Sequence, residues 1–199
     1  MAPSPSKGKA HKQGAPGHSR GVSPYVYLGI GAVAIVAIAL AITLLSQANR
    51  PGEEAPLMTA QFRNAHSWLG TSMDSNPNGD GIPYTTDPPT HGPHTTYLAR
   101  WGVYKEAVPR AVLVHNMEDG GVIIWYNPSL LSLMGLKLLT DIVEGYPQHV
   151  VLTPYPSLST PVAVTAWGRI LRLTAMDTGK VFDFINAYKG IDHHVAAQG

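Results

Sequence analysis

Residues 25–45 read YVYLGIGAVAIVAIALAITLL, a run of 21 residues with no charged side chain. A helix of this length covers the hydrocarbon core of a bilayer, which is about 30 Å thick. The chain before the run carries Lys7, Lys9, Lys12 and Arg20 and no acidic residue. The positive-inside rule then keeps the N-terminus in the cytoplasm and exports the rest of the chain. We therefore expect a single-pass protein of the cell membrane with an extracytoplasmic C-terminal domain.

The same run also permits a cleaved signal peptide, since Ser46-Gln47-Ala48 loosely resembles a small-x-small cleavage site. The apolar region of a signal peptide is about 7–15 residues long, and this one is longer. An uncleaved anchor is therefore the preferred interpretation. Either alternative places the C-terminal domain outside the cytoplasm.

The composition divides the chain into four parts. Residues 1–24 are rich in Pro, Ser, Gly and Lys and predict a disordered, basic cytoplasmic arm. Residues 25–45 are the predicted transmembrane helix, and residues 46–60 form a polar linker that contains two prolines. Residues 61–192 remain for one extracytoplasmic domain, which is long enough to bury a core.

Composition also excludes several functions. Cysteine is absent, which rules out disulfides, thiolate catalysis and cysteine-based metal sites. A net charge of +1 gives no basic field for nucleic acid. Charged residues make up 14% of the chain, whereas about a quarter is usual. The expected partners are the lipid bilayer and, in one interpretation, a larger membrane protein complex that covers the domain.

Hydrophobic patterns in the exported part alternate between strands and helices. Residues 111–115 and 121–126 read as two strands, and the six residues 116–121 between them predict an antiparallel hairpin. Helical spacing predicts helices at 129–145 and 178–188, the second capped by Thr178 with Phe182 among its core residues. Further strands are expected at 149–153, 161–167 and 168–175. The fold class is α+β, a mostly antiparallel sheet packed with two helices.

Histidines concentrate in two turn-like segments, Pro88–His94 and Val114–Gly121. Imidazoles held by rigid Gly/Pro turns suit a metal site. If His115 ends a strand, Met117 points to the same face, and a His/Met pair favours copper. Glu118 and Asp119 would add oxygen ligands or accept imidazole hydrogen bonds. The candidate metal ligands are His94, His115, His91, His66, Met117 and Asp119. Each has a simpler interpretation as a structural histidine or, for Met117, as core.

A second candidate site is the segment Asp74-Ser-Asn76-Pro-Asn78-Gly-Asp80. Its alternating oxygen ligands match the start of a calcium loop. The twelfth position should be a bidentate glutamate, and it is Thr85. The same residue types are common in ordinary turns. Calcium is therefore the weaker cofactor hypothesis.

The two histidine segments resemble a bacterial membrane-anchored family of unknown function that has a PPTSGPH motif followed by an HNLEHG motif. The resemblance covers roughly residues 60–190. It departs from the family at two positions: the motif serine is His91 here, and the second motif histidine is Asp119. Either His91 replaces that imidazole in space, or Asp119 serves as an oxygen ligand, or the site has decayed.

These observations favour a membrane-anchored extracytoplasmic protein that binds a transition metal, with copper as the first candidate. Binding or delivery is preferred to catalysis, because no nucleophile or general-base constellation stands out. The alternative is an accessory subunit of a larger membrane complex, with a docking domain and no metal. A hydrolase with a metal-bound water is a third, weaker option.

Overall fold

The computed structural model describes residues 24–48 and 50–194, except for the side chains of residues 24, 26–32 and 46–48. The chain forms two compact units, residues 1–48 and residues 49–199. The described part of the first unit is helix α1 (Pro24–Ala48), which includes the whole uncharged run. Over the described residues, no helix is both long enough and apolar enough to cross a membrane. The predicted transmembrane span is therefore not confirmed, and the predicted basic arm lies almost entirely outside the described residues.

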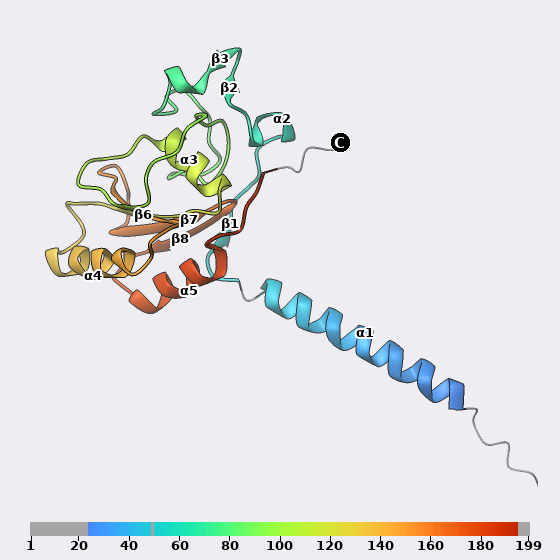
Figure 1. The fold of residues 1–199 in the computed structure, drawn as a ribbon. Helices are drawn as coiled ribbons and strands as arrows, with labels where there is room; N and C mark the ends of the chain where they lie inside the picture. The colour runs from blue at the N-terminus through green and yellow to red at the C-terminus, as the bar shows by residue number, and fades with distance from the viewer. Residues whose placement is uncertain (1–23, 49, 195–199) are drawn as a thin grey trace, which may run out of the picture. The chain divides into compact units, whose positions relative to one another are not determined.

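The second unit is built on a six-stranded mixed sheet (Figure 1). Its strand order is β1-β8-β7-β5-β6-β4. The strands are β1 (Glu53–Glu54), β4 (Gly102–Val103), β5 (Val122–Tyr126), β6 (Val150–Pro154), β7 (Val162–Ala166) and β8 (Arg169–Leu173). Three neighbouring pairs are antiparallel, whereas β5–β6 and β6–β4 are parallel. The α+β class and the mostly antiparallel sheet are thus confirmed.

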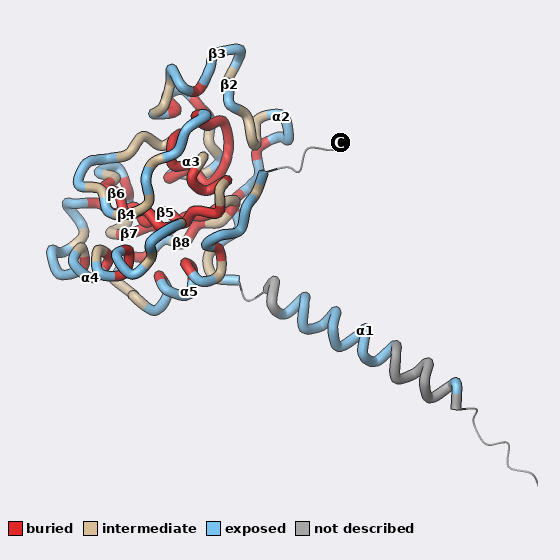
Figure 2. Tube along the Cα trace, in the orientation of Figure 1, coloured by how far each residue is buried: buried red, intermediate tan, exposed pale blue. Residues whose placement is uncertain are grey.

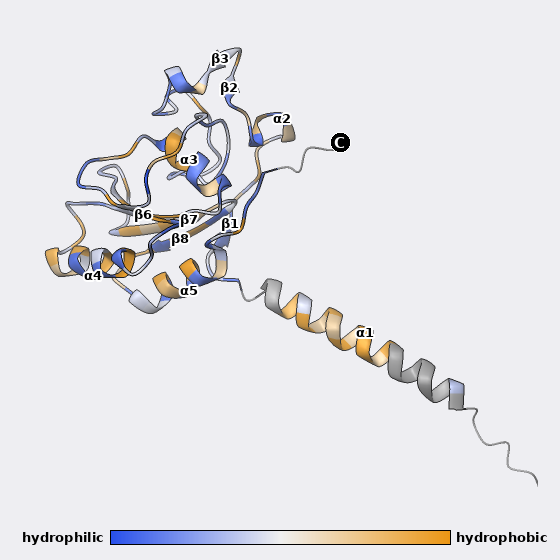
Figure 3. Ribbon diagram, in the orientation of Figure 1, coloured by the Kyte–Doolittle hydropathy of each residue, from blue (hydrophilic) through white to orange (hydrophobic). Residues whose placement is uncertain are grey.

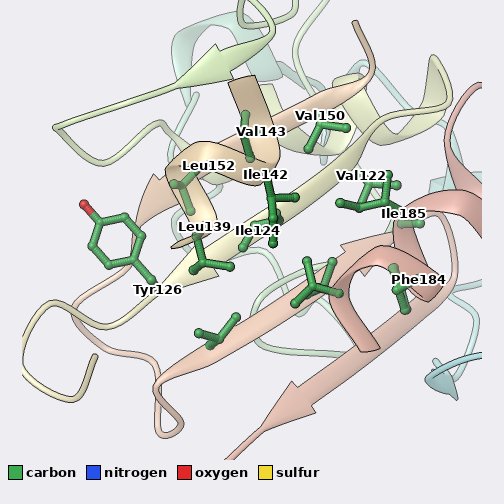
Figure 4. Packing of buried hydrophobic residues seen from close by; sticks show 14 of the residues in the cluster. Val122, Ile124, Tyr126, Leu139, Ile142, Val143, Val150, Leu152, Phe184 and Ile185 are labelled. Carbon is green, nitrogen blue, oxygen red and sulfur yellow. The ribbon is translucent and has the colours of Figure 1, made fainter. Parts of the chain in front are cut away.

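Helices cover the two faces of this sheet. On one face lie α4 (Leu133–Glu144) and α5 (Thr178–Tyr188), and on the other lies α3 (Arg110–Glu118) (Figure 1). Alternate residues of β5 point to opposite faces: Ile124 joins the cluster under α4 and α5, and Trp125 joins the cluster under α3. Figure 4 shows Ile124 beside Leu139 and Ile142 of α4. Because both faces are covered, all five residues of β5 are buried (Figure 2).

The predicted hairpin at residues 111–126 is wrong, because its first strand is helix α3. Alternating Val112 and Val114 imitate a strand, since β-branched residues favour one. A surface helix would show a polar face opposite an apolar stripe. Helix α3 lacks that pattern because seven of its nine residues are buried. Pro109, at the N-cap, is typical of the start of a helix, but the strand-like valines led to the strand prediction.

The other expected elements are confirmed with small changes in their ends. The strands at 149–153, 161–167 and 168–175 are β6, β7 and β8. Helix α4 begins later than expected, after the N-cap Ser132. Helix α5 has its expected bounds, but Asp177 rather than Thr178 caps it, and Phe182 is 41% exposed rather than core. The short elements α2 (Ala60–Arg63), β2 (Ser67–Trp68), β3 (Thr71–Ser72) and the 3-10 turn η1 (Met73–Ser75) precede a long loop that packs near α3.

Candidate metal centre

The last turn of α3 presents three potential ligands on one face. Residues three and four apart in a helix are neighbours on its surface, which places Glu118 and Asp119 beside His115. His115 Nε2 lies 3.6 Å from an oxygen of Asp119. The C-terminal end of a helix carries partial negative charge and favours a cation there. Because this segment is a helix and not a strand, His115, Glu118 and Asp119 lie together as one group of potential ligands.

The C-terminal segment adds a fourth side chain. After α5 the chain runs back along the end of α3 (Figure 1). The Gly190 amide donates to the Gly120 carbonyl at 2.7 Å, and the His193 amide donates to the Glu118 carbonyl at 2.8 Å. Gly120 has a φ of +77°, and a Cβ there would lie 2.8 Å from the Gly190 backbone, so only glycine fits. This docking brings His194 to the end of α3.

Three of these side chains, His115, Glu118 and His194, form a group spaced for one metal ion, and Asp119 lies beside both histidines. His194 Nε2 lies 3.4 Å from a Glu118 oxygen and 3.5 Å from an Asp119 oxygen. Tetrahedral ligands about 2.0–2.2 Å from an ion lie about 3.3–3.6 Å from one another. The ligand atoms of His115, Glu118 and His194 all lie within 4.8 Å of one another. This group could hold a metal ion.

Backbone carbonyls fix the neighbouring imidazoles in one tautomer. His115 Nδ1 lies 2.8 Å from the Thr95 carbonyl, and His94 Nδ1 lies 2.8 Å from the Gly92 carbonyl. His66 Nδ1 lies 3.2 Å from the same Thr95 carbonyl. A carbonyl can only accept, so each Nδ1 carries the proton and donates it. Each Nε2 then keeps its lone pair, which is how metal-binding histidines are usually oriented.

Two buried polar atoms at this place have no hydrogen bond. They are His94 Nε2 and Asp119 Oδ1, two of four such side-chain atoms in the part of the chain that the structure describes. His94 Nε2 is 2.9 Å from a Glu118 oxygen, close enough for a charge pair but without hydrogen-bond alignment. Burying such atoms unsatisfied costs free energy. A cation bound at the end of α3 would give such an atom a partner and reduce that cost.

The surroundings keep Glu118 ionised. Burial acts to raise the pKa of Glu118, but the adjacent His94 side chain, a hydrogen bond from Asn64 and the charge of His194 together lower it. The Asn64 amide donates to the other Glu118 oxygen at 2.6 Å, which leaves one oxygen facing the histidines. Burial lowers the pKa of His115 and favours its neutral, metal-binding form. The hydrogen bond to Asp192 raises the pKa of the exposed His194.

The structure gathers some predicted ligands and separates others. The His66 and His94 rings are 4.7 Å apart, and the His94 and His115 rings are 5.3 Å apart. Two candidates do not join them. Met117 is fully buried in the core beneath α3, because a helix turns it away from His115. It therefore offers no thioether to the site.

His91 has a structural task instead. Its Nε2 accepts the Met58 amide at 2.8 Å, and its Nδ1 lies 3.0 Å from the Thr90 hydroxyl. Both ring nitrogens are thus engaged, and the ring is fully buried. Burial lowers the pKa of His91 to about 4, with a further contribution from the charge of Arg63. His91 therefore does not take the place of the second motif histidine, the position that is Asp119 in this chain.

The predicted calcium loop is held by contacts of its own. Asp74 accepts the amide and hydroxyl of Thr96, both at 2.7 Å. The Asn76 side chain bonds the Asp80 backbone in both directions, and Asp80 lies 3.8 Å from Arg110. Arg110 Nε donates to the Asn78 carbonyl. These contacts engage Asp74, Asn76 and Asp80, which were candidate calcium ligands, with other groups of the protein.

Sequence reasoning missed His194, and it considered Glu118 as an oxygen ligand but left it out of the list of candidate metal ligands. The spacing His115-x-x-Glu118-Asp119 is one face of a helical turn, so it would have identified both carboxylates had the helix been recognised. No local pattern marks His194, because a tertiary contact far along the chain brings it there.

A family model described as "Protein of unknown function (DUF3105)" matches residues 76–198, which is more than half of the chain. The match includes Asp119 and the whole C-terminal segment. No curated protein and no solved structure gives a significant match.

Proposed function

The chain belongs to the DUF3105 family, and we propose that it binds a divalent transition metal ion through His115, Glu118, Asp119 and His194. The observation that carries this proposal is the spacing of the ligand atoms: His194 Nε2 lies 3.4 Å from a Glu118 oxygen and 3.5 Å from an Asp119 oxygen. His115 Nε2 lies 3.6 Å from the same Asp119 oxygen. Two carboxylates and neutral imidazoles balance the charge of a divalent cation. His94 lies close enough to Glu118 to act as a fifth ligand or as the partner that orients this carboxylate.

The donor set favours some metals over others. Imidazole and carboxylate suit zinc and Cu(II), whereas Cu(I) is selected by thiolate or thioether. Since Met117 lies in the core, the His/Met argument for Cu(I) no longer holds. Copper stays in the proposal as Cu(II), which such sites bind more tightly than zinc. His194 is half exposed, and an exposed ligand supports exchange or delivery of the ion rather than a closed structural site.

Asp119 is one of the two positions at which this chain departs from the motifs that it resembles, and it takes the place of a histidine. Asp119→Ala is expected to weaken Zn²⁺ binding about 10–100-fold, because it removes one donor. Asp119→His restores the motif at a position that faces His115, and we expect it to hold Zn²⁺ at least as tightly as the wild-type chain. Competition titrations with a chelator measure both. X-ray absorption at the metal edge should show one more nitrogen neighbour in Asp119→His. Wild-type affinity in Asp119→Ala would remove Asp119 from the ligand set.

The proposal keeps the predicted location. The location outside the cytoplasm is predicted from the uncharged run at residues 25–45 and the basic residues before it. The domain would then meet metal outside the cytoplasm.

A second candidate function, a docking subunit of a larger membrane complex, is favoured by the start of α4. Leu133 is 87% exposed and Met134 is 66% exposed. Figure 3 shows hydrophobic residues along α4. Large apolar side chains grouped this way often mark protein contacts. This function predicts that the chain migrates far above its own 21.3 kDa after mild detergent extraction. A lone monomer would count against it.

A further inference from the structure

Residues 189–194, the strap, connect α5 to the proposed metal centre. Their contacts with the rest of the domain are few and mostly polar. The backbone amide of Gly190 donates to the Gly120 carbonyl, and that of His193 donates to the Glu118 carbonyl. The side-chain amide of Asn64 donates to the His193 carbonyl at 3.3 Å. The His193 ring stacks on Trp167 with 5.9 Å between ring centres.

The strap buries little of itself. All its described residues except His193 are exposed, and Ile191, its one aliphatic side chain, is 40% exposed. Local stability follows the number of buried apolar contacts, so a segment with so few of them docks weakly by itself.

His194 differs from the other proposed ligands in the part of the chain that carries it. His115, Glu118 and Asp119 all lie at the end of α3, on a helix buried against the sheet. His194 alone comes from the strap, and Asp192 Oδ1 holds its Nδ1 at 2.7 Å so that Nε2 faces the two carboxylates. One ion bound to all four side chains therefore ties the strap to α3.

We propose that the strap is a metal-dependent latch: ion binding locks residues 189–194 onto α3, and loss of the ion releases them. This inference rests on the proposed metal function and adds a regulatory consequence to it. Because linkage is reciprocal, a docked strap also holds the ion more tightly. A docked strap then indicates a bound ion, and a released strap indicates an empty site. The stacking of His193 on Trp167 forms when the strap docks and breaks when it is released.

Hydrogen exchange of the full-length, untagged chain tests the latch, with Zn²⁺ alone as the probe. We expect saturating Zn²⁺ to slow exchange of the Gly190 and His193 amides at least about tenfold, and to leave the β5 amides unchanged as an internal reference. His194→Ala should still bind Zn²⁺ weakly through the three α3 ligands, yet show no protection of the strap at saturation. Ile191→Ala, in the same strap but outside the ligand set, should keep the protection.

Direct titration of Zn²⁺ on the same samples separates the two proposals. Binding with unchanged exchange of the strap would overturn the latch and leave the metal function intact. Absence of binding would overturn the metal function and the latch with it. Protection that persists in His194→Ala would also overturn the latch.

Discussion

His115→Ala is expected to weaken Zn²⁺ binding at least about 100-fold. Loss of a residue that only orients a ligand typically costs 10–100-fold in affinity, and His115 is a ligand itself. Its Nδ1 is fixed on the Thr95 carbonyl and its Nε2 lies 3.6 Å from Asp119, so no neighbouring side chain replaces it without moving α3. Chelator competition on the full-length chain, after removal of any histidine tag, measures the change.

Met117→Leu is the matched control for this variant. Residue 117 lies two positions away on the same helix and is fully buried, and exchange of methionine for leucine in a core usually costs little. We expect wild-type Zn²⁺ affinity in Met117→Leu. A loss there equal to that of His115→Ala would return the thioether to the ligand set. Unchanged affinity in His115→Ala would remove the central ligand of the proposed site.

Acid is expected to destabilise the fold through His91. Burial lowers its pKa in the folded chain to about 4, against 6.5 for an ordinary histidine. Between these two values the unfolded chain binds the proton and the folded chain does not, so the free energy of unfolding falls as the pH is lowered. The full contribution is present above pH 6.5 and is lost near pH 4, an effect on the order of 3 kcal/mol. Urea unfolding at a series of pH values between 4 and 7.5 measures it.

The comparison with His91→Gln isolates this contribution from those of other groups. A glutamine oxygen can accept the Met58 amide as His91 Nε2 does, but it does not titrate. The variant is expected to be somewhat less stable than wild type at neutral pH and to lose less stability on acidification. Equal loss in the two proteins would show that His91 protonates in the folded state as freely as in the unfolded one.

The parts of the fold that were predictable are those with clear periodicity. Strands β6 and β7 are short, fully buried apolar runs, β8 alternates apolar and polar residues, and helix α5 has 3.6-residue spacing, and their bounds were close to those expected. Helix α3 was not predictable in this way, because Ala111 to Val114 are buried on all sides and leave no polar face. The parallel pairing of β6 with β5 was not predictable either, since it depends on the crossover through α4.

The candidate site was predictable in composition but not in geometry. His66, His94 and His115 were all candidate ligands, and the structure brings their rings close together. Assigning Met117 to the site and leaving Glu118 out of the candidate list both follow from the single error at α3. A strand points residues 115 and 117 to one face, whereas a helix points residues 115 and 118 to one face. The structural role of His91 was not predictable for another reason. It depends on a tertiary contact with Met58 and a local contact with Thr90, and residue spacing indicates neither.

The most direct test of the metal centre is elemental analysis of the full-length, untagged chain beside the His115→Ala/Glu118→Gln variant, both purified without chelators and confirmed as folded. The proposed function predicts close to one equivalent of zinc or copper in the wild-type chain and almost none in the variant. No metal in either protein after incubation with zinc or copper, or equal metal in both, would contradict it.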